Sequence, residues 1–119
     1  MAARGTLVFV AGQIGWNAHC EFDSDDFVAQ VRQALQNVKD VLAQAGARPE
    51  HITRMTWYVT DKREYLSRGK ELGVVFREVI GVYNAAMSAV QVSALMDDRA
   101  KVEIEVTAVV PDSIPSMGS

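Results

Sequence analysis

Two segments of this chain have the composition of β-strands and are apolar on both faces, and this feature constrains the fold most. Residues 6–14, TLVFVAGQI, are rich in valine and bounded by glycines, and residues 52–60, ITRMTWYVT, are β-branched and aromatic. Successive side chains of a strand point to opposite faces. Both faces of the predicted sheet therefore have to be covered.

Two helical patterns lie between the predicted strands. The first has apolar residues at every third or fourth position, namely Phe27, Val31, Leu35, Val38, Leu42 and Ala45. Ser24 or Asp25 is the expected N-cap, and Gly46 the expected stop. A second helix is predicted between residues 65 and 80, weakened by two internal glycines and ended by Gly81. Asp61 is its expected cap.

The remaining segments complete a single domain. Residues 16–26 are polar and predict a loop or a short strand, and two further strands are expected at 86–94 and 101–110. The order of elements predicts an α+β domain over residues 1–111, followed by a disordered tail at 112–119. Two helices can cover only one face of such a sheet, so the apolar second face predicts an oligomer.

Composition excludes several classes of protein. The formal net charge is −3 and no cluster of lysine and arginine is present, so no nucleic-acid partner is expected. No apolar run approaches the roughly 18–20 residues of a membrane span, and the N-terminus lacks the pattern of a signal peptide. Cys20 is the only cysteine, which rules out an internal disulfide. We expect a reducing, cytoplasmic compartment and no membrane partner.

Known catalytic and cofactor motifs are not found in the sequence. His19, Cys20 and Glu21 are adjacent, without the spacing of a metal site, so no metal is expected. Adjacent side chains point apart, which also disfavours a dyad of His19 and Cys20. No glycine-rich nucleotide-binding motif and no nucleophile elbow occurs, so we expect no cofactor.

The last predicted strand, KVEIEVTAV, carries two glutamates on its polar face. Glu103 and Glu105 lie two residues apart in an alternating pattern, about 6–7 Å from each other. One interpretation is a solvated strand face whose charges keep it soluble. The other is that one carboxylate is partly buried between subunits, where it acts as a proton shuttle.

Four segments, in their order and spacing, resemble the RidA/YjgF family of enamine/imine deaminases. They are TLVFVAGQIG, QVRQALQNVKDVLAQAGA, ITRMTWYVTD and KVEIEVTAVV, and the resemblance extends from Ala3 to Pro111. It implies a chorismate-mutase-like α+β fold, with a mixed β-sheet and two helices packed on one face. It also implies a homotrimer whose sheets face the centre, with small-molecule ligands bound in clefts between subunits.

The resemblance also implies roles for individual residues. Glu103 matches the glutamate that activates the hydrolytic water, and Gly12 matches a retained glycine. Met87 stands where the family has an arginine that grips the substrate carboxylate, and Ala11 stands where it has a serine. The backbone at Gly12 and Ala89 would hold the reacting group. We also expect an apolar wall from Met87, Trp16 and Leu72, the last two chosen from their position in the sequence and not from the resemblance.

Two functions follow from this altered motif. The first is hydrolysis of an imine, enamine or related C–N bond with altered specificity, ordinary 2-imino acid deamination being weak or lost. The second is a non-catalytic trimer that binds a small molecule or a protein. Arg99, Arg68 or Arg77 could replace the lost carboxylate anchor. Ribonuclease activity, which some relatives carry as a label, is disfavoured by the net charge.

Overall fold

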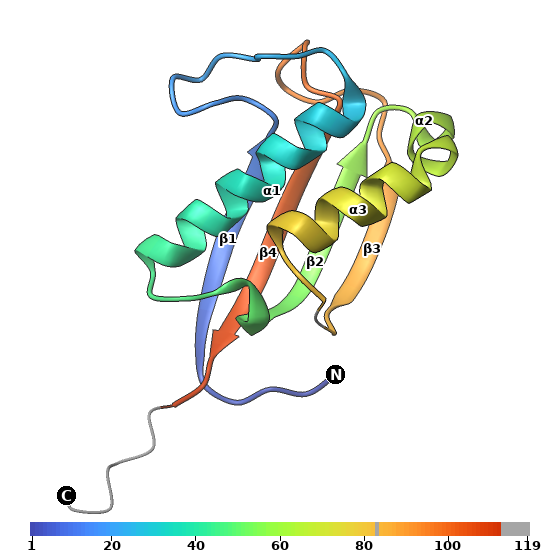
Figure 1. Ribbon diagram of the computed structural model, residues 1–119. Helices are drawn as coiled ribbons and strands as arrows, with labels where there is room; N and C mark the ends of the chain where they lie inside the picture. The colour runs from blue at the N-terminus through green and yellow to red at the C-terminus, as the bar shows by residue number, and fades with distance from the viewer. Residues whose placement is uncertain (83, 113–119) are drawn as a thin grey trace, which may run out of the picture.

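A four-stranded sheet forms one layer of the molecule (Figure 1). The computed structural model describes residues 1–82 and 84–112. The strands, in sheet order, are β1 (Thr6–Ile14), β4 (Val102–Val110), β2 (Ile52–Val59) and β3 (Ala86–Gln91). β4 pairs antiparallel with β1 and β2, whereas β3 pairs parallel with β2. The predicted α+β class with a mixed sheet is confirmed.

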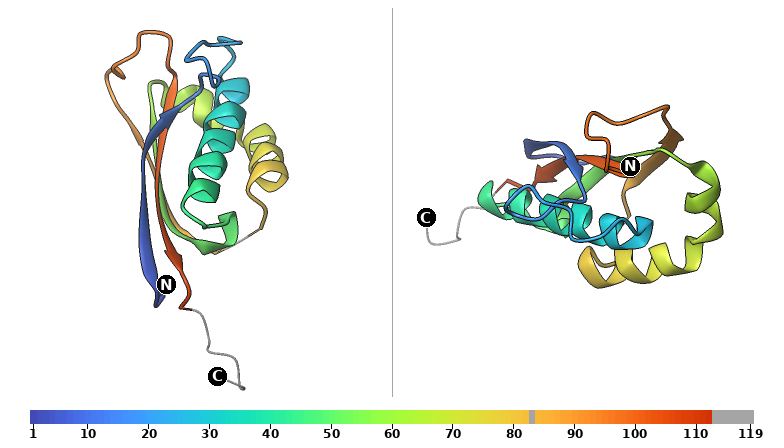
Figure 2. Two further views of the ribbon diagram at one scale, coloured as in Figure 1. Left: turned by 90° about the vertical axis from the view of Figure 1, so that its left-hand side faces the viewer. Right: turned by 90° about the horizontal axis from the view of Figure 1, so that it is seen from above.

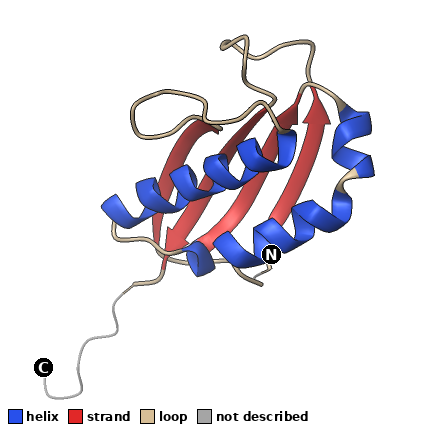
Figure 3. Cartoon of the chain, turned by 45° about the horizontal axis from the view of Figure 1, so that its top comes forward, coloured by secondary structure: helices blue, strands red, loops and turns tan. Residues whose placement is uncertain are grey.

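The helices form the second layer, on one face of the sheet. Helix α1 (Phe27–Gln44) and helix α3 (Gly69–Val79) lie side by side across that face, as Figures 2 and 3 show. The short helix α2 (Lys62–Ser67) precedes α3, and a 3₁₀ turn (Pro49–His51) precedes β2. The predicted packing of helices on one face is confirmed.

The core lies between these two layers, where the two apolar patterns meet. Every third or fourth residue of α1 faces every second residue of β1 and β4, because the two periods place those side chains on the facing surfaces. Leu35 and Leu42 of α1 are fully buried together with Met55 and Ile104 of the sheet. Burial of a side chain of this size contributes about 1.5–3 kcal/mol.

Two predicted boundaries are wrong, each for a local reason. The N-cap of α1 is Asp26, whose carboxylate accepts from Ala29 N at 3.0 Å, because Ser24 instead accepts from the backbone N–H of Asp26. β3 ends at Gln91 and not at residue 94, since Gln91 pairs with Val59, where β2 itself ends. The predicted caps at Gly46 and Asp61 are confirmed.

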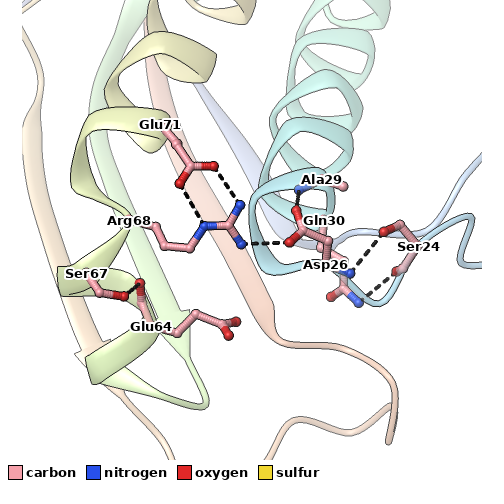
Figure 4. A network of polar contacts seen from close by, with 8 residues as sticks. All are labelled: Ser24, Asp26, Ala29, Gln30, Glu64, Ser67, Arg68 and Glu71. Atoms are coloured by element: carbon pink, nitrogen blue, oxygen red, sulfur yellow. Dashed lines mark hydrogen bonds and ion pairs between the residues drawn. The ribbon is translucent and has the colours of Figure 1, made fainter.

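The second predicted helix is interrupted at Arg68, between α2 and α3. The Arg68 guanidinium donates two hydrogen bonds to Glu71, of 3.0 and 2.6 Å, and one of 2.6 Å to Asp26 at the start of α1 (Figure 4). The hydrogen bond from Arg68 holds the pKa of the Asp26 carboxyl below its usual value, with a further contribution from the Ala29 N–H. The same guanidinium lowers the pKa of Glu71. These hydrogen bonds connect the junction between α2 and α3 to the N-terminus of α1.

No helix or strand within the described residues covers the second face of the sheet. Leu7 and Phe9 of β1 are 58% and 74% exposed there, although their neighbour Val10 is buried under the helices.

Residues 16–26, expected as a loop or short strand, form a loop. Of the tail predicted at 112–119, residues 113–119 lie outside the described part of the chain. No helix in the described ranges is long and apolar enough to cross a membrane.

Candidate functional site

The two glutamates of β4 have different surroundings, although both lie on the open face of the sheet. Glu105 is exposed and accepts a hydrogen bond of 2.9 Å from the Tyr58 hydroxyl. This bond raises the pKa of Tyr58, because the phenolic proton is held by the carboxylate. Glu103 is half-buried, and no hydrogen bond to its carboxylate is formed within residues 1–82 and 84–112. Glu103 is therefore the carboxylate left free for a ligand.

A β-bulge in β1 brings Gly12 against Glu103. Val10 pairs with Val106, but the next pair along β1 is Gln13 with Ile104, so Ala11 and Gly12 lie in the irregular part. A Cβ atom placed on Gly12 would lie 2.6 Å from Glu103 Cδ and 2.9 Å from Oε1. The carboxylate thus lies directly on the Gly12 backbone, in a space that only glycine leaves open.

Ala11 lies on the same open face. It is exposed and lines a shallow depression with Phe9, Arg54 and Glu105. Alternation along β1 places Ala11 on the face that includes Leu7 and Phe9, in agreement with this position. Ala11 and Gly12 thus form the β1 side of the surface next to Glu103.

A separate apolar groove lies between α3 and the β3 edge. Its volume is about 420 Å³, within the range of small-molecule sites. Met87, 48% exposed, and Leu72 both line it. The other lining residues are Trp57, Tyr65, Leu66, Gly69, Gly73, Phe76, Arg77, Gly81 and Val82.

Glu103 and Met87 lie on opposite faces of the sheet. Met87 pairs with Met55, which is buried under the helices, and paired residues of neighbouring strands point to the same face. Glu103 pairs with Tyr58 on the open face. One chain therefore cannot bring Glu103 and Met87 to the same ligand.

Two other predicted residues lie apart from both places. Trp16 packs in the loop after β1, with its ring 6.1 Å from that of Phe22, and its carbonyl accepts from the Asn37 side chain at 2.8 Å. Ala89 is exposed in β3 and pairs with Trp57, but it does not line the groove. Of the predicted apolar wall, only Met87 and Leu72 share one surface.

Sequence reasoning missed the aromatic residues of the groove. Trp57, Tyr65 and Phe76 line it, and the rings of Trp57 and Tyr65 meet edge to face at 6.0 Å. The available signal was the spacing of Gly69 and Gly73, four residues apart and hence on one helix face. Both glycines had counted only as weakening the helix.

The three arginines predicted as possible replacement anchors have different surroundings. Arg68 is bound by two carboxylates, as described above. Arg99 forms an ion pair of 2.8 Å with Asp25, and its guanidinium lies 5.3 Å from the Phe22 ring centroid. Arg77 lines the groove. No group of three metal-ligating side chains is found among the described residues.

The geometry defines a class of protein: a small mixed-sheet α+β domain with an open sheet face and a glutamate held against a glycine bulge. The family model described as Endoribonuclease L-PSP matches residues 1–110. The chain belongs to this family, which also carries the names RidA and YjgF.

Individual relatives agree with this assignment. The 2-iminobutanoate/2-iminopropanoate deaminase of Salmonella typhimurium is 32% identical over 105 residues, covering 88% of this chain and 80% of the relative. The structure of the Rid family protein YyfB from Yersinia pestis has a TM-score of 0.79 at 33% identity, over 89% of this chain and 80% of that one. Escherichia coli TdcF with bound serine has a TM-score of 0.77 at 33% identity, over 92% and 84%.

Proposed function

We propose that this protein hydrolyses an imine, enamine or related C–N bond, with a specificity that differs from ordinary 2-imino acids. The reaction would take place in clefts between the copies of a homotrimer. The position of Glu103 carries the proposal: it is half-buried, unpaired within the described residues and held against Gly12. The deaminase names of relatives support the same reaction class.

Glu103 suits the role of a general base. Its carboxylate would accept a proton from a water molecule as the oxygen adds to the C=N carbon. That proton, with one from the new hydroxyl group, would then reach the nitrogen as the C–N bond breaks. An imine and water thereby give a carbonyl compound and ammonia. General base catalysis of this kind contributes about 10²–10⁴ in rate.

Met87 supports the altered specificity. An arginine at its position would grip a substrate carboxylate through charge-assisted hydrogen bonds, each worth roughly 1.5–3 kcal/mol. A thioether offers no donor, so a small anionic substrate beside it would lose hydration without compensation. We therefore expect weak activity on 2-iminobutanoate and 2-iminopropanoate.

The trimer is proposed from the two faces of the sheet. Leu7 and Phe9 form exposed apolar surface on the open face, which a second copy would bury. Because Glu103 and Met87 lie on opposite faces, a cleft containing both needs the Glu103 of a neighbouring copy. A ring of copies that bury their open sheet faces against one another would bring Glu103 of one copy to Met87 of the next. The number three rests on the family resemblance. Cytoplasmic location stays a prediction.

Ammonia release from a panel of imines tests this proposal, with two matched variants. Glu103→Gln removes the base while keeping size and shape, and Glu105→Gln makes the same change one pleat away on the same strand face. We expect Glu103→Gln to lose at least a hundredfold in kcat/KM and Glu105→Gln to keep most of it. Equal rates for wild type and Glu103→Gln would remove Glu103 from the mechanism.

The alternative function is a trimer that binds a small molecule without turnover. The observation in its favour is the apolar character of the groove around Met87, whose described lining residues include no carboxylate, histidine or lysine. Saturable binding with no ammonia release from any imine would favour this alternative. The family's endoribonuclease name receives less support, since Arg32, Arg48, Arg68 and Arg99 are already paired with carboxylates.

A further inference from the structure

The groove between α3 and β3 has an unusual charge pattern. Among its lining residues, Arg77 is the only charged one, and the rest of the wall is formed mainly by aromatic and aliphatic side chains with three glycines. An isolated cation at the edge of an apolar surface attracts a ligand with the complementary design: an apolar body and one anionic group.

Arg77 is not engaged by the chain's own acids. Of the acidic residues of α3, Glu71 is bound to Arg68, and Glu78 forms an ion pair of 2.7 Å with Arg32. Within residues 1–82 and 84–112, Arg77 forms no ion pair or side-chain hydrogen bond. Its guanidinium folds back along the helix, and a Cβ atom on Gly73 would lie 3.5 Å from Nη1. Gly73 thus leaves the guanidinium room over the groove.

Trp57 belongs to the same wall. It is 3% exposed, and its Nε1–H is the one buried side-chain polar group described that lacks a hydrogen-bond partner. Because this atom is buried, Trp57 contributes the apolar surface of its ring to the groove. Arg77 supplies the charge that suits an anionic ligand.

We propose that this groove binds an apolar monocarboxylate, with Arg77 as the anionic anchor and Trp57, Phe76 and Met87 as the apolar wall. Arg77 thereby takes over the carboxylate grip that Met87 cannot supply. The ligand class is a carboxylic acid with an aromatic or branched aliphatic group, because the aromatic rings and the thioether of the wall offer apolar contact surface.

Binding of a carboxylate in the groove does not depend on the proposed function, but turnover does. If the proposed function holds, the substrate is a 2-imino acid with a large apolar side chain, whose reacting carbon meets the Glu103 of a neighbouring copy. Binding of a stable carboxylate requires no reaction, so it is measured separately.

Isothermal titration with 3-phenylpropanoate and with its uncharged amide tests the anchor. We expect the carboxylate to bind wild type at least tenfold more tightly than the amide, and the difference to shrink as salt is added. Arg77→Gln should reduce carboxylate affinity to that of the amide. Arg63→Gln, an exposed arginine of α2 outside the groove, is the matched control and should change nothing.

A second variant separates the groove from the charge. Gly69 lines the groove and a Cβ atom there meets no atom within 4 Å, so we expect Gly69→Phe to place a ring in the groove. It should weaken binding of both probes equally. Equal affinity of wild type for the two probes, unchanged binding by Arg77→Gln, or no saturable binding would each overturn the inference.

Glu103→Gln distinguishes this inference from the proposed function. It should bind 3-phenylpropanoate at least as tightly as wild type does, because a negative charge near the bound carboxylate is removed, while losing imine hydrolysis. If hydrolysis depends on Glu103 but the probe does not bind, the groove inference fails alone. If the probe binds through Arg77 but hydrolysis ignores Glu103, the proposed function fails alone.

Discussion

The Glu103 side chain lies directly against the backbone of Gly12: a Cβ atom on Gly12 would lie 2.6 Å from Glu103 Cδ. The bulge in β1 creates this contact, and it distinguishes Glu103 from Glu105 two residues later on the same strand face. A glycine here therefore sets the position of the proposed base.

Gly12→Ala is expected to reduce imine hydrolysis at least tenfold with little loss of stability. The new methyl group meets the outer atoms of a flexible side chain, so Glu103 can turn aside while the backbone stays in place. Activity assays and thermal unfolding on the same preparations check this. Gly73→Ala, where the new Cβ makes only ordinary contact, is the control for the unfolding measurement alone and should raise stability by up to about 1 kcal/mol. Full activity in Gly12→Ala would refute the role of this contact.

Met87→Arg is expected to gain activity on 2-iminobutanoate. The new guanidinium would supply charge-assisted hydrogen bonds to the substrate carboxylate, and one such bond is worth about tenfold or more in kcat/KM. Steady-state kinetics on 2-iminobutanoate measure the gain. Leu66→Arg, which adds a cation elsewhere on the groove wall, serves as the control. A gain of the same size in both variants would show a general charge effect.

Phe9→Glu is expected to convert the assembly to monomers. Phe9 is 74% exposed on the open sheet face, and a carboxylate buried there against a neighbouring copy would lack a partner. Light scattering after size-exclusion chromatography measures the mass. Met96→Glu, which changes a fully exposed residue in the loop between β3 and β4, should leave the mass unaltered. An unchanged mass for Phe9→Glu would contradict assembly through this face.

Acid should destabilise the wild type through the Arg68 network. The pKa values of Asp26 and Glu71 are lowered in the folded protein, chiefly by hydrogen bonds from Arg68, from reference values of 3.8 and 4.5. Their contribution is thus fully present above those reference values and is lost as the pH falls through the lowered ones. Denaturant titrations between pH 7 and pH 3 should show a steeper decline for wild type than for Arg68→Met. Parallel curves for the two proteins would exclude this network as the cause.

The sequence predicted the elements better than their contacts. Periods of two and 3.6 residues located β1, α1, β2 and β4, because burial on one face imposes those periods directly. Asp26 is the N-cap because Ser24 accepts from the backbone N–H of Asp26 and Asp26 accepts from Ala29 N. The spacing of apolar residues carries no information on these hydrogen bonds. The break at Arg68 depends on Asp26, 42 residues away in the sequence.

For the candidate site, too, the sequence predicted which residues matter better than how they are arranged. Glu103 and Glu105 occupy equivalent positions in one alternating pattern, and two contacts distinguish them: Gly12 lies against Glu103, and the Tyr58 hydroxyl donates to Glu105. Arg77 could be named as one of three arginines, but its selection required knowing that the other two are bound by carboxylates. The family resemblance supplied Met87 and Glu103, whereas their separation onto opposite faces followed from strand register.

A mixing experiment tests most directly whether one site is built from two copies. Glu103→Gln and Gly69→Phe are each expected to be inactive, the first lacking the base and the second lacking the groove. When the two are unfolded together and refolded at equal concentrations, a cleft draws its two halves independently, so about one quarter of the clefts should be intact. The account predicts recovery of about a quarter of wild-type imine hydrolysis. No recovery above the separate variants would contradict it.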